Sequence, residues 1–245
     1  MRKVIIIPAR YGSTRFPGKP LAMLWDKPII QHVYERAIAS DIKEVYVATD
    51  DERIYETVIN FGGKAIMTSK EHSCGTERIA EASSILGLSE EDLIINLQGD
   101  QPLFRPEFFS LLITPLLLSS DIVMATLATP IKDPKDLKDP NKVKVVLDRE
   151  GRALYFSRSP IPYFRPPGSE PVYLKHIGVY AYKKKFLDKF IKLPKGTLEE
   201  AEKLEQLRVL EYGYKIGVNI IPVDIPEVDT PEDLEAIKNL KGEFK

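Results

Sequence analysis

Residues 4–19, VIIIPARYGSTRFPGK, carry the strongest fold signal in the chain. The apolar run Val4–Ile7 has the length and composition of a strand that is buried on both faces. A loop rich in glycines, hydroxyls and cations follows directly after Pro8. Because ligands of open α/β sheets bind outside the carboxyl ends of the strands, this loop is the first place to look for a site.

The alternation of strand and helix continues through the first half of the chain. Ile30, Val33, Tyr34, Ala37 and Ile38 recur at the spacing of one helical face. Strands separated by helices of such length imply right-handed βαβ units and a mostly parallel sheet. We predict strands over 45–49, 93–97 and 122–129, and helices over 51–61, over 76–86 and from Pro106 onward.

The pattern changes after Pro130. Turn residues between two apolar segments predict a hairpin, and Thr230 with Asp233 forms the cap signature of a last helix. This half therefore completes the sheet and adds a smaller antiparallel lobe. The predicted elements are strands over 143–148, 153–156, 172–182 and 215–223, and helices over 184–192, over 199–212 and after Thr230.

Composition excludes several classes of protein. The 245 residues hold 35 Lys and Arg against 36 Asp and Glu, so no basic field favours nucleic acid as a partner. A single cysteine, Cys74, excludes an internal disulfide framework and a Cys-based zinc finger. The apolar run at the N-terminus is too short for a signal peptide, and no run is long enough to span a membrane. We expect a cytoplasmic protein.

The loop after the first strand has the composition of an anion-binding site. Its glycines permit backbone N–H groups to turn toward a ligand, and its cations favour a polyphosphate. The spacing matches neither the P-loop nor the dinucleotide fingerprint, because Pro20 follows Lys19 and G-x-G-x-x-G is absent. A solvated basic loop is the alternative. The residues concerned are Arg10, Gly12, Ser13, Thr14, Arg15, Gly18 and Lys19.

Asp100 follows the predicted strand 93–97, within Gln98–Pro102. A carboxylate beside a polyphosphate favours Mg²⁺, which takes one or two protein carboxylates together with phosphate oxygens. Asp229 offers a second carboxylate. Each aspartate has an alternative role, Asp100 in a turn and Asp229 at a helix start.

Five motifs resemble those of the 3-deoxy-manno-octulosonate (KDO) cytidylyltransferases, which are sugar nucleotidyltransferases. They are IIPARYGSTRFPGKPLA, LQGDQPL, HIGVYAY, EQLRVLEYG and VDTPEDL, and they extend from residue 5 to 234. The resemblance implies a Rossmann-like sheet, Mg²⁺ as cofactor, and transfer of CMP from CTP to KDO with release of pyrophosphate, for lipopolysaccharide synthesis. It also implies a homodimer built through the smaller lobe. We expect one catalytic domain over 1–245, in which 1–130 bind CTP, about 131–220 include the smaller lobe and 221–245 return to the main part.

The resemblance also assigns site residues. Arg10, Arg15, Lys19 and Asp100 are the predicted catalytic residues, and Asp100 and Asp229 are the predicted Mg²⁺ ligands. Cys74 is read as a packing residue of the base-contacting turn, not a nucleophile. The predicted nucleotide set is Ala9, Arg10, Ser13, Thr14, Arg15, Lys19, Cys74, Gly75, Arg78 and Gln98, and the predicted sugar set is Gln98, Arg158, His176, Tyr180, Glu205 and Gln206.

Several alternatives stay open. Arg78 could be an ordinary residue of the first helical turn, His176 a structural histidine, and Glu205 the partner of Arg208. At the level of function, the alternatives are a cytidylyltransferase for another acidic sugar, such as sialic acid, and a non-catalytic nucleotide sensor. Two intact metal-binding carboxylates disfavour the sensor.

Overall fold

The computed structural model describes residues 1–12, 15–169 and 171–240, which fold into two compact units. The first unit comprises Met1–Phe109 and Ile225–Lys245, and the second comprises Ser110–Asp224. The strand at 122–130 belongs to the second unit, where it pairs with two other strands of that unit.

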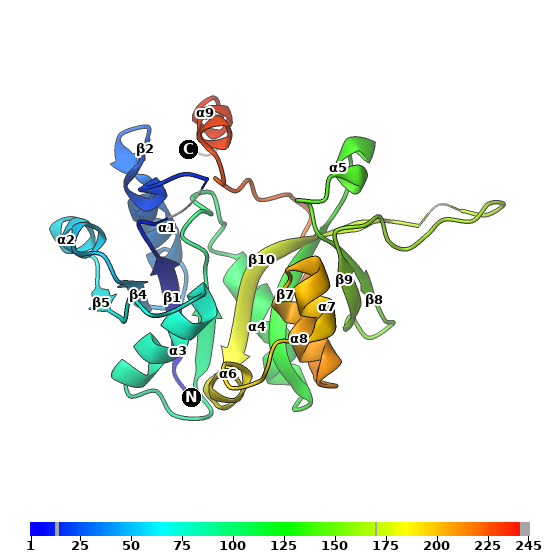
Figure 1. The fold of residues 1–245 in the computed structure, drawn as a ribbon, viewed down its shortest axis with the longest axis horizontal. Coiled ribbons are helices and arrows are strands. Elements are labelled where there is room, and N and C mark those ends of the chain that lie inside the picture. The colour runs from blue at the N-terminus through cyan, green and yellow to red at the C-terminus, as the bar shows by residue number, and fades with distance from the viewer. Residues whose placement is uncertain (13–14, 170, 241–245) are drawn as a thin grey trace. The chain divides into compact units, whose positions relative to one another are not determined.

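A parallel sheet forms the centre of the first unit (Figure 1). The order of its strands is β6 (Leu93–Asn96), β1 (Lys3–Ala9), β4 (Glu44–Thr49) and β5 (Ala65–Met67). Val4–Ile7 are fully buried, which confirms the prediction of a strand covered on both faces. The short β5 has no counterpart in the sequence prediction.

Helices connect these strands as the periodicity predicted. They are α1 (Ile29–Ile38), α2 (Glu52–Asn60) and α3 (Gly75–Ile85), with the short elements η1 (Lys19–Leu21), β2 (Met23–Leu24) and β3 (Lys27–Pro28) between β1 and α1. Asp51 caps α2 by accepting a hydrogen bond from the backbone N–H of Arg53. The last helix, α9 (Pro231–Lys238), has the predicted reciprocal cap between Thr230 and Asp233.

The second unit is mainly antiparallel. Its strands are β7 (Ile122–Pro130), β8 (Lys144–Leu147), β9 (Ala153–Ser157), β10 (Leu174–Lys183) and β11 (Lys215–Ile220). β7 lies between β10, which is antiparallel to it, and β11, which is parallel. The hairpin β8–β9 has the predicted antiparallel pairing, and β8 continues the sheet beyond β10. The fold class, a mostly parallel α/β sheet with a smaller antiparallel part, is confirmed.

Several helix boundaries differ from the sequence prediction. α4 (Phe108–Leu118) begins two residues after Pro106, which lies in the preceding turn. α5 (Pro134–Lys138) has no counterpart in the prediction, whereas α6 (Lys184–Phe190) was expected. The helix predicted over 199–212 is two helices, α7 (Thr197–Glu202) and α8 (Gln206–Glu211), because Lys203 adopts a left-handed conformation with φ 54°. Within the described part of the chain, no helix is long and apolar enough to span a membrane.

Candidate active site

The loop after β1 is closed by a backbone hydrogen bond. Gly18 has φ +72° and donates its N–H to the carbonyl of Tyr11 at 2.9 Å. A Cβ at Gly18 would lie 3.1 Å from the Tyr11 ring, so both the backbone conformation and the space require glycine. Lys19 follows in a short 3₁₀ helix, while Arg10 is exposed. Two predicted ligands of this loop, Ser13 and Thr14, lie outside the described residues.

Arg53, which the sequence analysis did not single out, also contacts the loop after β1. The guanidinium of Arg53, on α2, lies 3.3 Å from the centroid of the Tyr11 ring. Arg53 is also paired with Asp51 at 2.6 Å. The arginine therefore connects the start of α2 to the loop through a cation–π contact. Arg53 and Tyr11 are far apart in the sequence, so no local motif predicts this contact.

The two predicted metal-binding aspartates meet at one lysine. Lys19 Nζ lies 2.8 Å from Asp100 Oδ2 and 3.5 Å from Asp229 Oδ1. Arg15 donates to both oxygens of Asp229, at 3.1 and 3.2 Å. Three residues of the predicted catalytic set and the second predicted metal ligand are therefore gathered at one place within the first unit.

Backbone and amide hydrogen bonds hold the two aspartates together. The N–H of Val228 donates to the carbonyl of Asp100 at 2.9 Å, and Gln101 Nε2 donates to Glu227 Oε1 at 2.8 Å. The Gln101 side chain is fully buried. These bonds attach the segment before α9 to the loop after β6, so the position of Asp229 is fixed relative to Asp100.

The donor set fits a magnesium ion shared with a polyphosphate. Two carboxylates surround a position that already attracts the Lys19 ammonium, and carboxylate oxygens are the ligands that Mg²⁺ takes in proteins. Among the described residues, no group of three or more His, Cys, Asp and Glu side chains could enclose a metal without other ligands. Phosphate oxygens and water would complete the coordination.

Two segments lie against the end of β1. A Cβ at Gly99 would lie 3.0 Å from the carbonyl oxygen of Pro8, and one at Gly75 would lie 3.4 Å from the Pro8 ring. The predicted base-contacting turn before α3 therefore lies beside Pro8. Ala9, the next residue of β1, is buried. Cys74 is the half-buried N-cap residue of α3, which is compatible with its reading as a packing residue.

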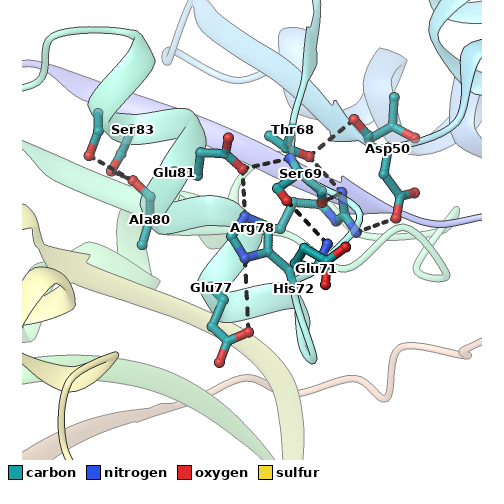
Figure 2. Close-up of polar contacts among 12 residues, drawn as sticks. Asp50, Thr68, Ser69, Glu71, His72, Glu77, Arg78, Ala80, Glu81 and Ser83 are labelled. Atoms are coloured by element: carbon teal, nitrogen blue, oxygen red, sulfur yellow. Dashed lines mark hydrogen bonds and ion pairs between the residues drawn. The ribbon is translucent and has the colours of Figure 1, made fainter.

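Arg78 is engaged inside the protein. It is 3% exposed, and its guanidinium donates to Asp50 Oδ2 at 2.8 Å and to Thr68 Oγ1 at 2.5 Å (Figure 2). Asp50 follows β4, and Thr68 follows β5. The visible role of Arg78 is to join these strand ends to the first turn of α3, and its predicted contact with the nucleotide stays a prediction.

Two glutamates of α3 hold the loop that precedes the turn. Glu81 accepts hydrogen bonds from the Ser69 N–H at 2.8 Å and from His72 Nε2 at 2.5 Å (Figure 2). Glu77 accepts from the Ser73 N–H at 2.7 Å. Partial burial raises the pKa of Glu81, but these hydrogen bonds outweigh burial and the net shift is downward. The loop that contains Ser69, His72 and Ser73 is thus attached to α3, the helix that follows it.

Three of the predicted sugar contacts lie together in the second unit. The rings of His176 and Tyr180 are 5.4 Å apart, and the Tyr180 hydroxyl donates to Gln206 Oε1 at 3.2 Å. Burial lowers the pKa of His176 to about 3, so the ring is neutral at physiological pH. These side chains form a neutral cluster of hydrogen-bonding groups, in which His176 and Gln206 are buried.

The remaining predicted sugar contacts have other neighbours. Arg158 donates through Nε to the carbonyl of Glu202 at 2.7 Å and through Nη1 to that of Pro140 at 2.9 Å. Gln98, in the first unit, donates to Asn96 Oδ1 at 2.8 Å. Glu205 is half-buried at the start of α8, while Arg208 forms a double ion pair with Glu199 at 2.6 Å.

Comparisons with known proteins give a consistent result. The family model for cytidylyltransferases matches residues 4–216. An 8-amino-3,8-dideoxy-manno-octulosonate cytidylyltransferase from Shewanella pealeana is 58% identical over 96% of each chain. A 3-deoxy-manno-octulosonate cytidylyltransferase from Syntrophobacter fumaroxidans is 53% identical over 97% of this chain and 96% of its own. The solved structure of a CMP:2-keto-3-deoxy-manno-octonic acid synthetase complexed with CTP matches with a TM-score of 0.92, at 45% identity over 99% of both chains.

Proposed function

The chain belongs to the cytidylyltransferase family and is a nucleotidyltransferase, and on this basis we propose that it transfers CMP from CTP to KDO. The observation that carries the proposal is the contact of Lys19 with both Asp100 and Asp229, which places cations and metal-binding carboxylates at one point. The anomeric hydroxyl of the sugar attacks the α-phosphorus of CTP. The bond from that phosphorus to the bridging oxygen breaks, the hydroxyl proton is released to solvent, and pyrophosphate leaves.

Positioning and electrostatics are sufficient for this reaction. Arg10, Arg15 and Lys19 neutralise the triphosphate and the charge that develops on the leaving pyrophosphate. Asp100 and Asp229 would hold Mg²⁺, which supplies charge neutralisation at the phosphate oxygens. Since Lys19 and Arg15 already contact these carboxylates, they rearrange toward the phosphates when the nucleotide binds.

The sugar pocket would take an anionic acid with many hydroxyls. His176, Tyr180 and Gln206 supply neutral hydrogen-bonding groups, and the guanidinium of Arg158 would meet the carboxylate. Glu205 and Gln98 complete the proposed sugar set. The nucleotide set adds Ala9, Ser13, Thr14, Cys74, Gly75, Arg78 and Gln98.

A second candidate substrate is 8-amino-3,8-dideoxy-KDO, because a relative that is 58% identical carries the name of that activity. The two sugars differ at one carbon, where an ammonium replaces a hydroxyl. The product of either reaction would serve lipopolysaccharide synthesis in the cytoplasm.

The test measures pyrophosphate release with CTP and Mg²⁺ against KDO, its 8-amino analogue and sialic acid, with mass spectrometry of the CMP-sugar formed. We expect turnover with KDO and none with sialic acid. A kcat/KM at least ten-fold higher for the amino sugar would transfer the assignment to the second candidate. Nucleotide binding without release of pyrophosphate from any sugar would instead support a sensor.

We also propose a homodimer built through the second unit. Support comes from apolar side chains beside the β8–β9 hairpin that are largely exposed: Leu154 at 61%, Val172 at 73% and Ile220 at 51%. They line one depression together with Val145 and Leu147. Contiguous exposed apolar surface of this kind favours burial against a partner.

A further inference from the structure

The central strand pair of the second unit contains an irregularity at the predicted sugar site. Ile177 of β10 lies opposite Leu127 of β7, but the next pair is Tyr180 with Thr126. Gly178 and Val179 therefore have no partner residue on β7. A bulge of this kind changes the direction of side chains on either side of it, here His176 and Tyr180.

The side chain of Thr126 closes this bulge from the opposite strand. Thr126 is fully buried, and its Oγ1 lies 3.0 Å from the carbonyl oxygen of Ile177 and 2.7 Å from that of Val179. The same oxygen lies 2.9 Å from His176 Nε2. One hydroxyl thus contacts the backbone on both sides of the bulge and the ring of the predicted sugar ligand.

Counting protons at this hydroxyl gives the tautomer of the histidine. A threonine hydroxyl has one hydrogen to donate, and carbonyl oxygens can only accept. If the hydroxyl donated to Nε2, its lone pairs would face two carbonyl oxygens without a proton between them. The hydroxyl therefore donates to a carbonyl and accepts from the His176 Nε2–H. Because the ring is neutral, Nδ1 is then unprotonated and can only accept a hydrogen bond.

The neighbours of the ring hold it in this orientation. Phe156 contacts the ring edge to face at a centroid distance of 5.0 Å, and the backbone N–H of His176 donates to the carbonyl of Val143 at 2.8 Å. On the other side of Tyr180, Gln206 Oε1 accepts the Tyr180 hydroxyl, and the Gln206 NH2 group supplies hydrogen-bond donors. The pair His176 and Gln206 thus presents an acceptor and a donor.

We propose that Thr126 is a positioning residue that fixes His176 as the Nε2–H tautomer, so that Nδ1 selects a donor group, a hydroxyl or an ammonium, on the sugar. This inference rests on the proposed function for its ligand. A deoxy sugar, or one that is O-methylated at the contacted position, would lose this hydrogen bond. A carboxylate would be rejected at Nδ1, because two acceptors would face each other.

The first test reads the tautomer directly, without substrate. Long-range ¹H–¹⁵N spectra distinguish a protonated from an unprotonated ring nitrogen. The chain has three histidines, so comparison with His176→Asn assigns the signals. In the wild-type protein at pH 7 we expect a protonated Nε2 and an unprotonated Nδ1. A protonated Nδ1 would overturn the proposal.

The second test separates a positioning role from a structural one. Thr126→Val keeps the shape of the side chain and removes the hydroxyl, and Thr126→Ser restores the hydroxyl. We expect Thr126→Val to mix the tautomers and raise the KM for the sugar about five-fold or more, with the KM for CTP unchanged. Thr126→Ser should return both readouts to near the wild-type values. Thr129→Val, a second buried threonine of β7 that pairs with Lys175, is the matched control.

The outcomes are distinguishable from those for the proposed function. An unchanged tautomer and sugar KM in folded Thr126→Val would refute the positioning role. If Thr126→Val does not fold, the tautomer and sugar KM of Thr126→Ala, compared with the wild-type spectrum, test the positioning role in the same way. If the wild-type enzyme uses none of the three sugars, both the proposed function and the proposed sugar contact of His176 are refuted. The spectra of the His176 ring in wild type and Thr126→Val still show whether Thr126 sets the tautomer.

Discussion

Lys19 shows how single residues connect fold and chemistry in this protein. Its side chain is 13% exposed and lies between the carboxylates of Asp100 and Asp229, which are 25% and 36% exposed. Charges in such a half-buried place attract each other more strongly than exposed pairs do. The two ion pairs thus hold the Lys19 ammonium between the carboxylates that are proposed to bind the metal.

Asp100→Asn tests the metal-binding role at this scale. The amide keeps the shape but loses the charge that binds a hard cation, so we expect Mg²⁺-dependent turnover to fall by about 100-fold or more. CTP binding measured by calorimetry in EDTA should persist, because Lys19 is released from its partner. Asp224→Asn, which removes a carboxylate paired with Lys175, is the control and should leave turnover unchanged. Full activity of Asp100→Asn at ordinary Mg²⁺ would place the metal elsewhere.

His176 makes stability depend on pH. Burial lowers its pKa to about 3 in the folded state, against 6.5 for an unperturbed histidine. The unfolded chain therefore takes up a proton first as the pH falls. The contribution of the neutral His176 ring to the free energy of unfolding is complete above about pH 6.5 and is lost progressively toward pH 3.

We expect urea denaturation to give an unfolding free energy that falls more steeply in wild type than in His176→Asn over this window. The difference in slope is at most about 1.4 kcal/mol per pH unit. Other groups, such as Asp121 with its pKa lowered to about 2, contribute equally to both proteins and cancel. Parallel curves for the two proteins between pH 6 and 4 would contradict this account of the buried ring.

At the scale of elements, α4 approaches β11 closely where the strand carries a glycine. A Cβ at Gly217 would lie 2.4 Å from Pro115 Cβ and 3.3 Å from Ile122 Cγ2. The proline ring is rigid and cannot move aside by rotation. The close packing of this helix on the strand therefore depends on the missing side chain.

Gly217→Ala should destabilise the protein by about 1–3 kcal/mol, because the added methyl forces α4 away from the strand. Chemical denaturation with an unchanged m-value is the measurement. An effect below about 0.5 kcal/mol would mean that the helix shifts without loss of packing.

The break between α7 and α8 is a second feature of this scale. Glu199 and Arg208 are nine residues apart and form a buried ion pair at 2.6 Å, with side-chain exposures of 6% and 9%. In one continuous helix they would be separated by about 13 Å along the axis. The pair therefore requires the reversal at Lys203, whose φ of 54° is unfavourable for a residue with a Cβ.

Lys203→Gly should raise the unfolding free energy by about 0.5–1 kcal/mol, since glycine adopts this conformation without steric cost. Lys203→Ala removes the same side chain but keeps the Cβ, so it is the matched control and should give no such gain. Equal stability of the two variants would show that the left-handed conformation is not costly here.

At the scale of the whole molecule, the exposed apolar residues beside the β8–β9 hairpin lead to the proposed dimer. We expect sedimentation at micromolar concentration to give twice the chain mass of 27.8 kDa. Leu154→Asp combined with Val172→Asp should give monomers, because two charges would be buried in the interface. Ile85→Asp, on an apolar residue of α3 that is 57% exposed, should leave the dimer intact. A wild-type mass of one chain would end the dimer proposal.

The sequence by itself determined the features that depend on neighbours along the chain. The buried strand β1, the alternation with α1, α2 and α3, the reciprocal cap of α9 and the cation-rich loop after β1 were all predicted. The placement of Asp100 at the end of a buried strand was predicted in the same way. Periodicity, caps and turn composition act over a few residues, so their signal is present in the local sequence.

Only the tertiary structure decided which distant residues meet. The approach of Asp229 to Asp100 and Lys19 depends on the backbone bond from Val228, and the pair of Glu199 with Arg208 depends on the break at Lys203. The burial of Arg78 against Asp50, and of His176 against Thr126, likewise follows from contacts between separate elements. Such contacts gain their free energy from packing and burial in the assembled fold, and the local sequence carries no signal of which partner will be adjacent.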